Sequence, residues 1–213
     1  LLDIAAIPER YQQQALNDRY FTELKSEYQY LAHKFSLQAM DATQWRFLRL
    51  RPQNFPHIRI AQLARLYYEQ RAGLSQLLEC ESVKQVRELL ATQVTRYWET
   101  HYVFGEESLK SEKKLSAGSL NLLIINTVAP ILFAYGKHKN AEKYCERAFD
   151  FLEALKAEDN HIVRMWKEVG LMVETAGDSQ ALIQLKKAYC DRKDCLRCRI
   201  GYEYLKGKSS LKG

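Results

Sequence analysis

Three cysteines near the C-terminal end are the residues whose types and spacing are best suited to chemistry. Cys190, Cys195 and Cys198 lie in the segment YCDRKDCLRCRIG, which contains a Cys-x-x-Cys pair. Such a pair can direct two sulfurs at one soft metal ion, and the first cysteine can add a third ligand. A tetrahedral zinc site would need a fourth ligand, for which the candidates are Cys145, His138 and His161. In the alternative interpretation the thiols are small packing residues, so we expect either no cofactor or one zinc ion.

A second candidate site lies between residues 45 and 59, where arginines alternate with aromatic side chains. The arginines are Arg46, Arg49, Arg51 and Arg59, and the aromatic residues are Trp45, Phe47, Phe55 and His57. Guanidinium groups hold phosphate oxygens in a fork and aromatic faces stack on bases, so this combination is suited to single-stranded nucleic acid. In the alternative interpretation the aromatic residues are core anchors and the arginines form ion pairs with carboxylates.

Positive charge is concentrated in two regions of the chain. The formal net charge is +6, and residues 42–68 contain five arginines and no acidic residue. From Lys186 onward there are nine Lys or Arg residues and three Asp or Glu residues. The residues of this tail that we expect to contact phosphates are Arg192, Lys193, Arg197 and Arg199. Concentrated positive charge is typical of surfaces that bind phosphates or another acidic partner.

The sequence contains no arrangement that is typical of a catalytic centre. Its five histidines are scattered, and it has no glycine-rich phosphate loop, no His-Glu-x-x-His motif and no Gly-x-Ser-x-Gly motif. We therefore assign no catalytic residue and do not expect this chain alone to be an enzyme.

The elements that must position these residues are predicted to be helices. Apolar residues recur at helical spacing, and no segment shows the sustained alternation of a strand. One long helix is expected from about Glu9, and another from Pro56, where proline suits the first turn. The apolar stripe of the second of these helices consists of Ile60, Leu63, Ala64 and Tyr67. Pro52 and Pro56 should stiffen the connector that precedes it.

The second half of the chain is predicted to be a series of packed helices. Residues 119–135 should form an apolar helix with a kink near Pro130. Its most apolar part is shorter than the roughly 20 residues that a membrane helix needs, so we expect a buried core helix and no membrane partner. The helices that follow resemble tetratricopeptide-like hairpins without their fixed period. We therefore predict an all-α fold, an irregular bundle of antiparallel helices.

We expect one helical domain over residues 1–213, with a subdomain boundary in the polar loop 105–118. The sequence starts at Leu1 without a methionine, so we expect it to be a piece of a longer protein. The five cysteines are an odd number, which does not fit a secreted disulfide framework, and we find no signal peptide. A cytoplasmic location is the expectation.

Three motifs carry a resemblance to a known family. They are WRFLRLRPQNFPHIRIAQLA, INTVAPILFAYG and DSQALIQLKKAYCDRKDCLRCRIGYEYL. Together they resemble the C-terminal half of an uncharacterised bacterial family, domain of unknown function 2851, over essentially the whole chain. Fuller members of that family have an upstream half with a Glu-x-His-x-Lys-like segment, similar to the metal-dependent cores of restriction-endonuclease-type nucleases. The resemblance implies that this chain is a helical companion of a nuclease-like half, which would be its first partner.

Two functions remain open at this point. In the first, the chain is a helical accessory domain whose basic surfaces contact nucleic acid beside the nuclease-like half. In the second, it is a structural or protein-interaction domain with no ligand of its own.

Overall fold

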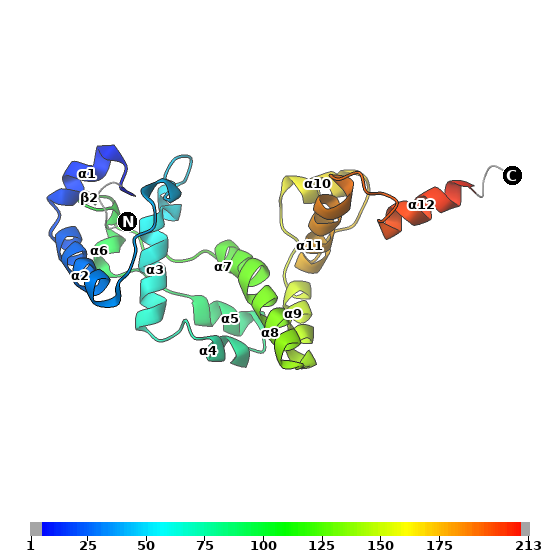
Figure 1. Cartoon of the computed structure of the whole chain (residues 1–213), viewed down its shortest axis with the longest axis horizontal. Coiled ribbons are helices and arrows are strands. Elements are labelled where there is room, and N and C mark those ends of the chain that lie inside the picture. Colours follow the sequence, from blue (N-terminus) through cyan, green and yellow to red (C-terminus); the bar gives the residue numbers. More distant parts are fainter. Residues whose placement is uncertain (1–5, 210–213) are drawn as a thin grey trace. The chain divides into compact units, whose positions relative to one another are not determined.

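The computed structural model describes residues 6–209 and divides the chain into two units (Figure 1). The first unit comprises residues 6–79 and 87–120, and the second comprises residues 80–86 and 121–209. The main division falls between Leu120 and Asn121, just after the polar segment 105–118. Both units are built mainly from helices, which confirms the all-α prediction.

The first unit combines helices with one small hairpin. Its helices are α1 (Glu9–Leu16), α2 (Arg19–Phe35), α3 (Pro56–Tyr68), α4 (Leu74–Glu79) and α6 (Arg96–Glu99), while α5 (Val83–Leu90) contains residues of both units. Single turns of 3-10 helix, Ala42–Gln44 and Pro52–Asn54, lie between α2 and α3. The strands β1 (His101–Val103) and β2 (Glu106–Glu107) pair in antiparallel orientation after α6. The sequence did not predict this hairpin, because strands of two and three residues are too short to show alternation.

The expected long helix from Glu9 is wrong, because the chain is interrupted between α1 and α2. Asp18 is the N-cap residue of α2. Its carboxylate accepts hydrogen bonds from the backbone N–H groups of Tyr20, at 2.7 Å, and Phe21, at 3.2 Å, and so caps α2. It also accepts a hydrogen bond from the hydroxyl of Tyr97. Asp18 therefore connects the start of α2 to α6.

The core of the first unit joins α1, α2, α3, α6 and the hairpin. Its buried members are Ile7, Ala15, Phe21, Ile58, Val94, Trp98 and Phe104. Gly105 follows this core between the two strands, with a φ of 73°, which L side chains rarely adopt. A Cβ atom added there would lie 2.2 Å from the backbone oxygen of Gln14. The hairpin therefore approaches α1 so closely that glycine is required.

The predicted orientation of α3 is wrong, although the helix itself begins at Pro56 as expected. The stripe predicted to face the core is exposed, with Ile60 40%, Leu63 51% and Tyr67 65% accessible. The buried residues of α3 are His57, Ile58, Gln62 and Leu66. The helix turns this face inward because the aromatic core surrounds His57 and because a distant backbone group satisfies the amide of Gln62.

The second unit contains helices that pair with their neighbours in sequence. α8 (Ala129–Lys139) packs on α9 (Glu142–Glu153), and α10 (His161–Glu168) packs on α11 (Ala176–Leu185). α7 (Ala117–Leu123), which contains residues of both units, leads into α8. α12 (Arg199–Ser209) follows α11 after a π-helical turn, Lys186–Cys190. The short connections between paired helices give the helical hairpins that the sequence indicated.

The apolar segment of the second half forms part of one continuous helix, Ala117–Lys139. This helix has 23 residues, and its most apolar window has a mean hydropathy of 1.7 and is 33% buried. By length and composition alone it could cross a membrane, a test that core helices of globular proteins also pass. Near Pro130, where a kink was expected, the helix contains the π-helical turn Ile124–Val128.

Candidate functional site

The structure places three of the four predicted arginines of the first unit on the surface. Arg46, Arg49 and Arg51 are exposed, and none of them forms an ion pair with a residue in the described range 6–209. They lie in the connector between α2 and α3, where Arg49 has a φ of 63°. The alternative interpretation, in which carboxylates neutralise these arginines, does not describe them.

The aromatic residues of the same segment have a packing role. The ring of Phe47 lies 5.3 Å from that of Phe55 and 5.2 Å from that of His57, between centroids. Phe55 and His57 are buried, and burial lowers the pKa of His57 to about 3. Buried rings cannot stack on bases, so the core-anchor interpretation applies to Phe55 and His57, whereas Trp45 and Phe47 are half-buried. The phosphate-binding potential of the segment therefore depends on its arginines.

A polar cavity of about 380 Å³ lies where this connector meets the chain that follows the hairpin. We call it the polar pocket. One wall consists of Arg51, Gln53, Asn54, Arg59 and Gln62, from the 3-10 turn Pro52–Asn54 and α3. The other wall consists of Ser111, Glu112, Lys113, Lys114, Ser116 and Ser119. Most of this second wall belongs to the segment 105–118, which the sequence predicted only as a surface loop, without a binding role.

Arg59 is held in the polar pocket by neutral side chains. Its Nη1 donates a hydrogen bond to Oε1 of Gln62 at 2.9 Å, and its Nη2 donates to Oδ1 of Asn54 at 2.6 Å. It forms no ion pair with a carboxylate among the described residues, and its burial lowers the pKa of the guanidinium group. The positive charge of Arg59 is therefore oriented but not neutralised.

A buried hydrogen bond joins the two walls of the polar pocket. Nε2 of Gln62 donates to the backbone oxygen of Lys113 at 2.7 Å, across 51 residues of sequence. Lys113 has a φ of 42°, and its Nζ donates to the backbone oxygen of Glu99 at 2.9 Å and lies 4.1 Å from the ring centroid of Tyr102. Burial lowers the pKa of Lys113. Its backbone thus shapes the pocket while its ammonium group is engaged elsewhere.

The charge of the polar pocket is positive. Arg51, Arg59 and Lys114 contribute three cations, and Glu112 is the acidic residue in the lining. Nζ of Lys114 lies 2.6 Å from a carboxylate oxygen of Glu112, but both side chains are largely exposed. Exposed pairs of this kind contribute little stability, so an incoming anion can compete for Lys114.

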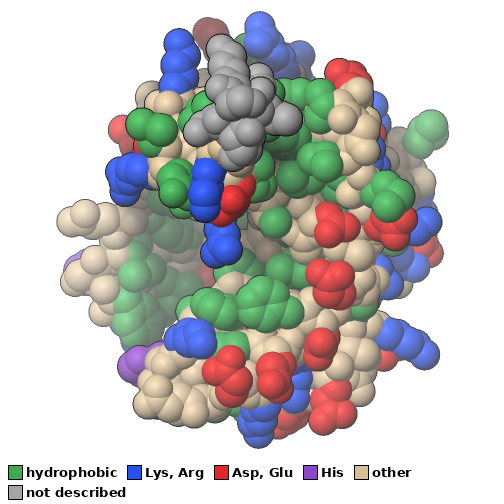
Figure 2. Space-filling model, turned by 90° about the vertical axis from the view of Figure 1, so that its right-hand side faces the viewer, with side chains coloured by type: hydrophobic (Ala, Val, Ile, Leu, Met, Phe, Trp, Pro, Cys, Tyr) green, Lys and Arg blue, Asp and Glu red, His purple; other side chains and the backbone are tan. Residues whose placement is uncertain are grey.

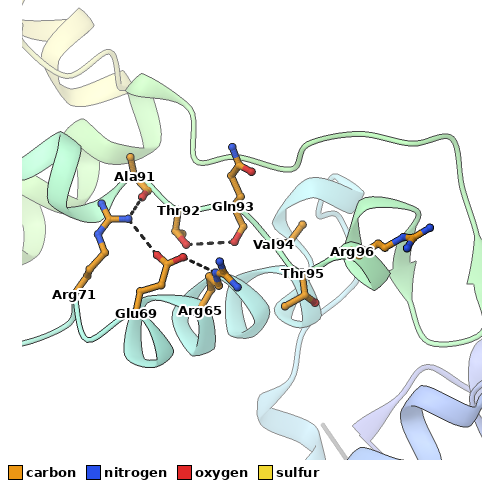
Figure 3. Close-up of a pocket in the computed structure, with 9 residues that line it drawn as sticks. All are labelled: Arg65, Glu69, Arg71, Ala91, Thr92, Gln93, Val94, Thr95 and Arg96. Atoms are coloured by element: carbon orange, nitrogen blue, oxygen red, sulfur yellow. Dashed lines mark hydrogen bonds and ion pairs between the residues drawn. The ribbon is translucent and has the colours of Figure 1, made fainter.

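A second pocket of the same unit holds arginines that are paired with a carboxylate (Figure 3). There, Glu69 forms two ion pairs. Its Oε1 lies 2.5 Å from Nε of Arg65, and its Oε2 lies 3.3 Å from Nη1 of Arg71. Nη1 of Arg71 also donates to the backbone oxygen of Ala91 at 2.8 Å. The hydrogen bond from Arg65 lowers the pKa of Glu69, which stays charged between the two arginines. This cluster braces α3 against the segment after α5, and both of its paired guanidinium groups are held by the one carboxylate.

The basic residues predicted in the tail are mostly exposed and belong to the second unit. Arg192, Lys193 and Arg199 are exposed, while Nη1 of Arg197 lies 3.6 Å from Oδ2 of Asp194. On the face seen in Figure 2, Lys and Arg side chains stand among hydrophobic and acidic ones and do not merge into one basic patch.

The three cysteines of the tail do not form a metal site in this arrangement. Cys190 and Cys195 are exposed, whereas Cys198 is buried. Within residues 6–209, no three His, Cys, Asp or Glu side chains are grouped so that they could hold one metal ion. Zinc binding by these residues stays a prediction to which the geometry adds no support.

Comparison with known proteins places the chain in a family. A family model described as "Protein of unknown function (DUF2851)" matches residues 7–161, a range that contains the whole polar pocket. The last motif of the resemblance, residues 178–205, and the basic tail lie outside this range. No curated protein matches the chain, and no solved structure matches it. Because the matched range covers more than half of the sequence, the chain belongs to the DUF2851 family of proteins of unknown function.

Proposed function

We propose that this chain is a helical accessory domain that contacts nucleic acid through phosphate groups. The observation that supports this function is the exposure of Arg46, Arg49 and Arg51, which have no carboxylate partner among residues 6–209. Exposed guanidinium groups without partners are available for charge-assisted hydrogen bonds to phosphate oxygens. Arg59 extends the same basic surface into the polar pocket.

The proposal includes a cellular setting that follows from the resemblance. The chain would act in the bacterial cytoplasm beside a nuclease-like upstream half, with no membrane partner, and would itself contribute no catalytic residue. Arg192, Lys193, Arg197 and Arg199 would add phosphate contacts outside the matched family range.

The salt dependence of binding tests this function. Each phosphate contact on single-stranded nucleic acid contributes a slope of about −0.7 to a plot of log affinity against log salt concentration. Four arginines in the first unit should therefore give a slope of about −3, measured by fluorescence anisotropy with a labelled oligonucleotide. The double variant Arg46→Gln/Arg49→Gln should reduce the magnitude of this slope by about 1.4, since two contacts are lost.

Arg65→Gln is the matched control for these substitutions. It removes one positive charge from the same unit, but Arg65 is already paired with Glu69. The control should therefore leave the slope nearly unchanged. A flat salt dependence, or an equal loss of slope in the control and in the double variant, would show that phosphate contacts by these arginines are not the function.

A specific observation also favours the second function, a protein-interaction domain. Ile60, Leu63 and Tyr67 form an apolar stripe along the exposed face of α3, at the spacing of one helical face. Contiguous exposed apolar residues are typical of surfaces that bind another protein. Under this function the partner is the upstream half, and oligonucleotide affinity in the salt experiment is negligible even at low salt.

A further inference from the structure

The polar pocket differs in shape from the open surface that carries Arg46 and Arg49. It is a half-open cavity of about 380 Å³ between two walls, which the buried hydrogen bond between Gln62 and Lys113 holds together. A continuous strand needs a groove that is open at both ends, whereas a cavity of this size accommodates one end group. The polar pocket is therefore better suited to a terminal group than to the middle of a strand.

The donors in the polar pocket are those that recognise phosphate. Arg59 uses only two of its five N–H groups for Asn54 and Gln62, so the rest of its fork is available. These two bonds fix the guanidinium plane before any ligand arrives, which reduces the entropy that binding must overcome. Ser111, Ser116 and Ser119 line the opposite wall, where the hydroxyl oxygens of Ser116 and Ser119 lie 3.0 Å apart in a hydrogen bond that a ligand would have to share.

The charge of the polar pocket distinguishes between two kinds of phosphate. Its three cations and one carboxylate leave an excess of two positive charges. A phosphodiester carries one negative charge, whereas a phosphomonoester carries about −1.5 to −2 at pH 7. The excess charge therefore complements a phosphomonoester more closely.

We propose that the polar pocket binds a phosphomonoester, either the terminal phosphate of a nucleic-acid strand or that of a free mononucleotide. This inference deepens the proposed function and rests on it, because it names the end group that the accessory domain would recognise. Arg51, Arg59 and Lys114 hold the phosphate oxygens, and the serine hydroxyls complete the contacts.

The test compares strands that differ only in their end group. Single-stranded oligonucleotides of one sequence, with a 5′-phosphate, a 3′-phosphate or only hydroxyl ends, are titrated against the full chain by fluorescence anisotropy. We expect one phosphorylated strand to bind about tenfold more tightly than the hydroxyl strand, the effect of one additional charge-assisted contact. Adenosine monophosphate and inorganic phosphate serve as competitors that identify a free mononucleotide as the source.

Matched variants show which residues cause the preference for a phosphorylated strand. Arg51→Gln and Arg59→Gln should abolish the preference for the phosphorylated strand, whereas Arg46→Gln should weaken all strands equally and preserve the preference. Glu112→Gln should increase the affinity for the phosphorylated strand, because it removes the carboxylate that lines the pocket. Arg51 is exposed and makes no ion pair in the described part of the chain, so its variant remains informative if Arg59→Gln fails to fold.

The outcomes separate this inference from the proposed function. Equal binding of all strands with a steep salt dependence would overturn the phosphomonoester site and leave nucleic-acid binding intact. Binding of adenosine monophosphate that Arg51→Gln abolishes, without binding of any strand, would support the pocket and overturn the proposed function. A preference that survives both pocket variants would also overturn the inference, since the end group would then be recognised elsewhere.

Discussion

His57 should make the stability of the first unit depend on pH. The imidazole is 2% exposed, and neither ring nitrogen has a hydrogen-bond partner among the described residues. Its neighbours are the rings of Phe47, Trp98 and Phe104, with centroids 4.8–5.8 Å away, and none of these carries a charge. Burial in this apolar surrounding lowers the pKa of His57 from 6.5 to about 3.

The sign and size of the effect follow from this lowered pKa. Between about pH 3 and pH 6.5 the unfolded chain binds a proton at His57 that the folded chain does not, so stability rises with pH over this range and is constant above it. Each pH unit is equivalent to about 1.4 kcal/mol. The free energy of unfolding should therefore be lower by about 2 kcal/mol at pH 5 than at pH 7.5, from this residue alone.

Urea unfolding, followed by tryptophan fluorescence at pH 7.5 and at pH 5, measures the effect in the parent chain and in His57→Leu. Leucine has a similar volume and no titratable group, and the two nitrogens that it replaces make no hydrogen bonds within the described residues. The variant should keep its stability at pH 7.5 to within about 1.5 kcal/mol and should lose about 2 kcal/mol less than the parent on acidification. If the two proteins lose the same stability between these pH values, burial does not hold the imidazole neutral and the reasoning is wrong.

Substitutions at Gly105 and Asp18 test the local structure of the first unit, with thermal unfolding as the measurement. Gly105→Ala should destabilise the unit by more than about 2 kcal/mol, because it combines a φ of 73° with a Cβ atom 2.2 Å from the backbone of Gln14. Gly170→Ala in the second unit, at a φ of 92° with no atom within 4 Å of the added Cβ, should cost only the backbone strain, and an equal loss in both variants would exclude the close contact as a cause. Asp18→Ala should cost about 2 kcal/mol, because it loses both the α2 cap and the hydrogen bond from the hydroxyl of Tyr97. Asp18→Asn should lose only the bond from Tyr97, because its side-chain oxygen can still accept both backbone bonds of the cap, and equal losses would contradict the capping role.

Local signals in the sequence were sufficient where a structural feature depends on neighbouring residues. Pro56 marks the first turn of α3 because a proline loses no hydrogen bond there, and the apolar spacing along the chain predicts helices in both units. The α1–α2 interruption was missed although Asp18 is a good capping residue, because the apolar spacing that predicted the helix begins only at Leu24, after the interruption.

The sequence by itself therefore determined the all-α class, most of the helices and the arginine-rich connector. Only the tertiary structure decided which face of α3 is buried, because an amphipathic pattern shows that a helix has two different faces but not what lies against each of them. The tertiary structure also creates the polar pocket, because its two walls are 51 residues apart in sequence where the hydrogen bond between Gln62 and Lys113 joins them. Burial and electrostatic pairing depend on such distant partners, and no local pattern of residue types encodes them.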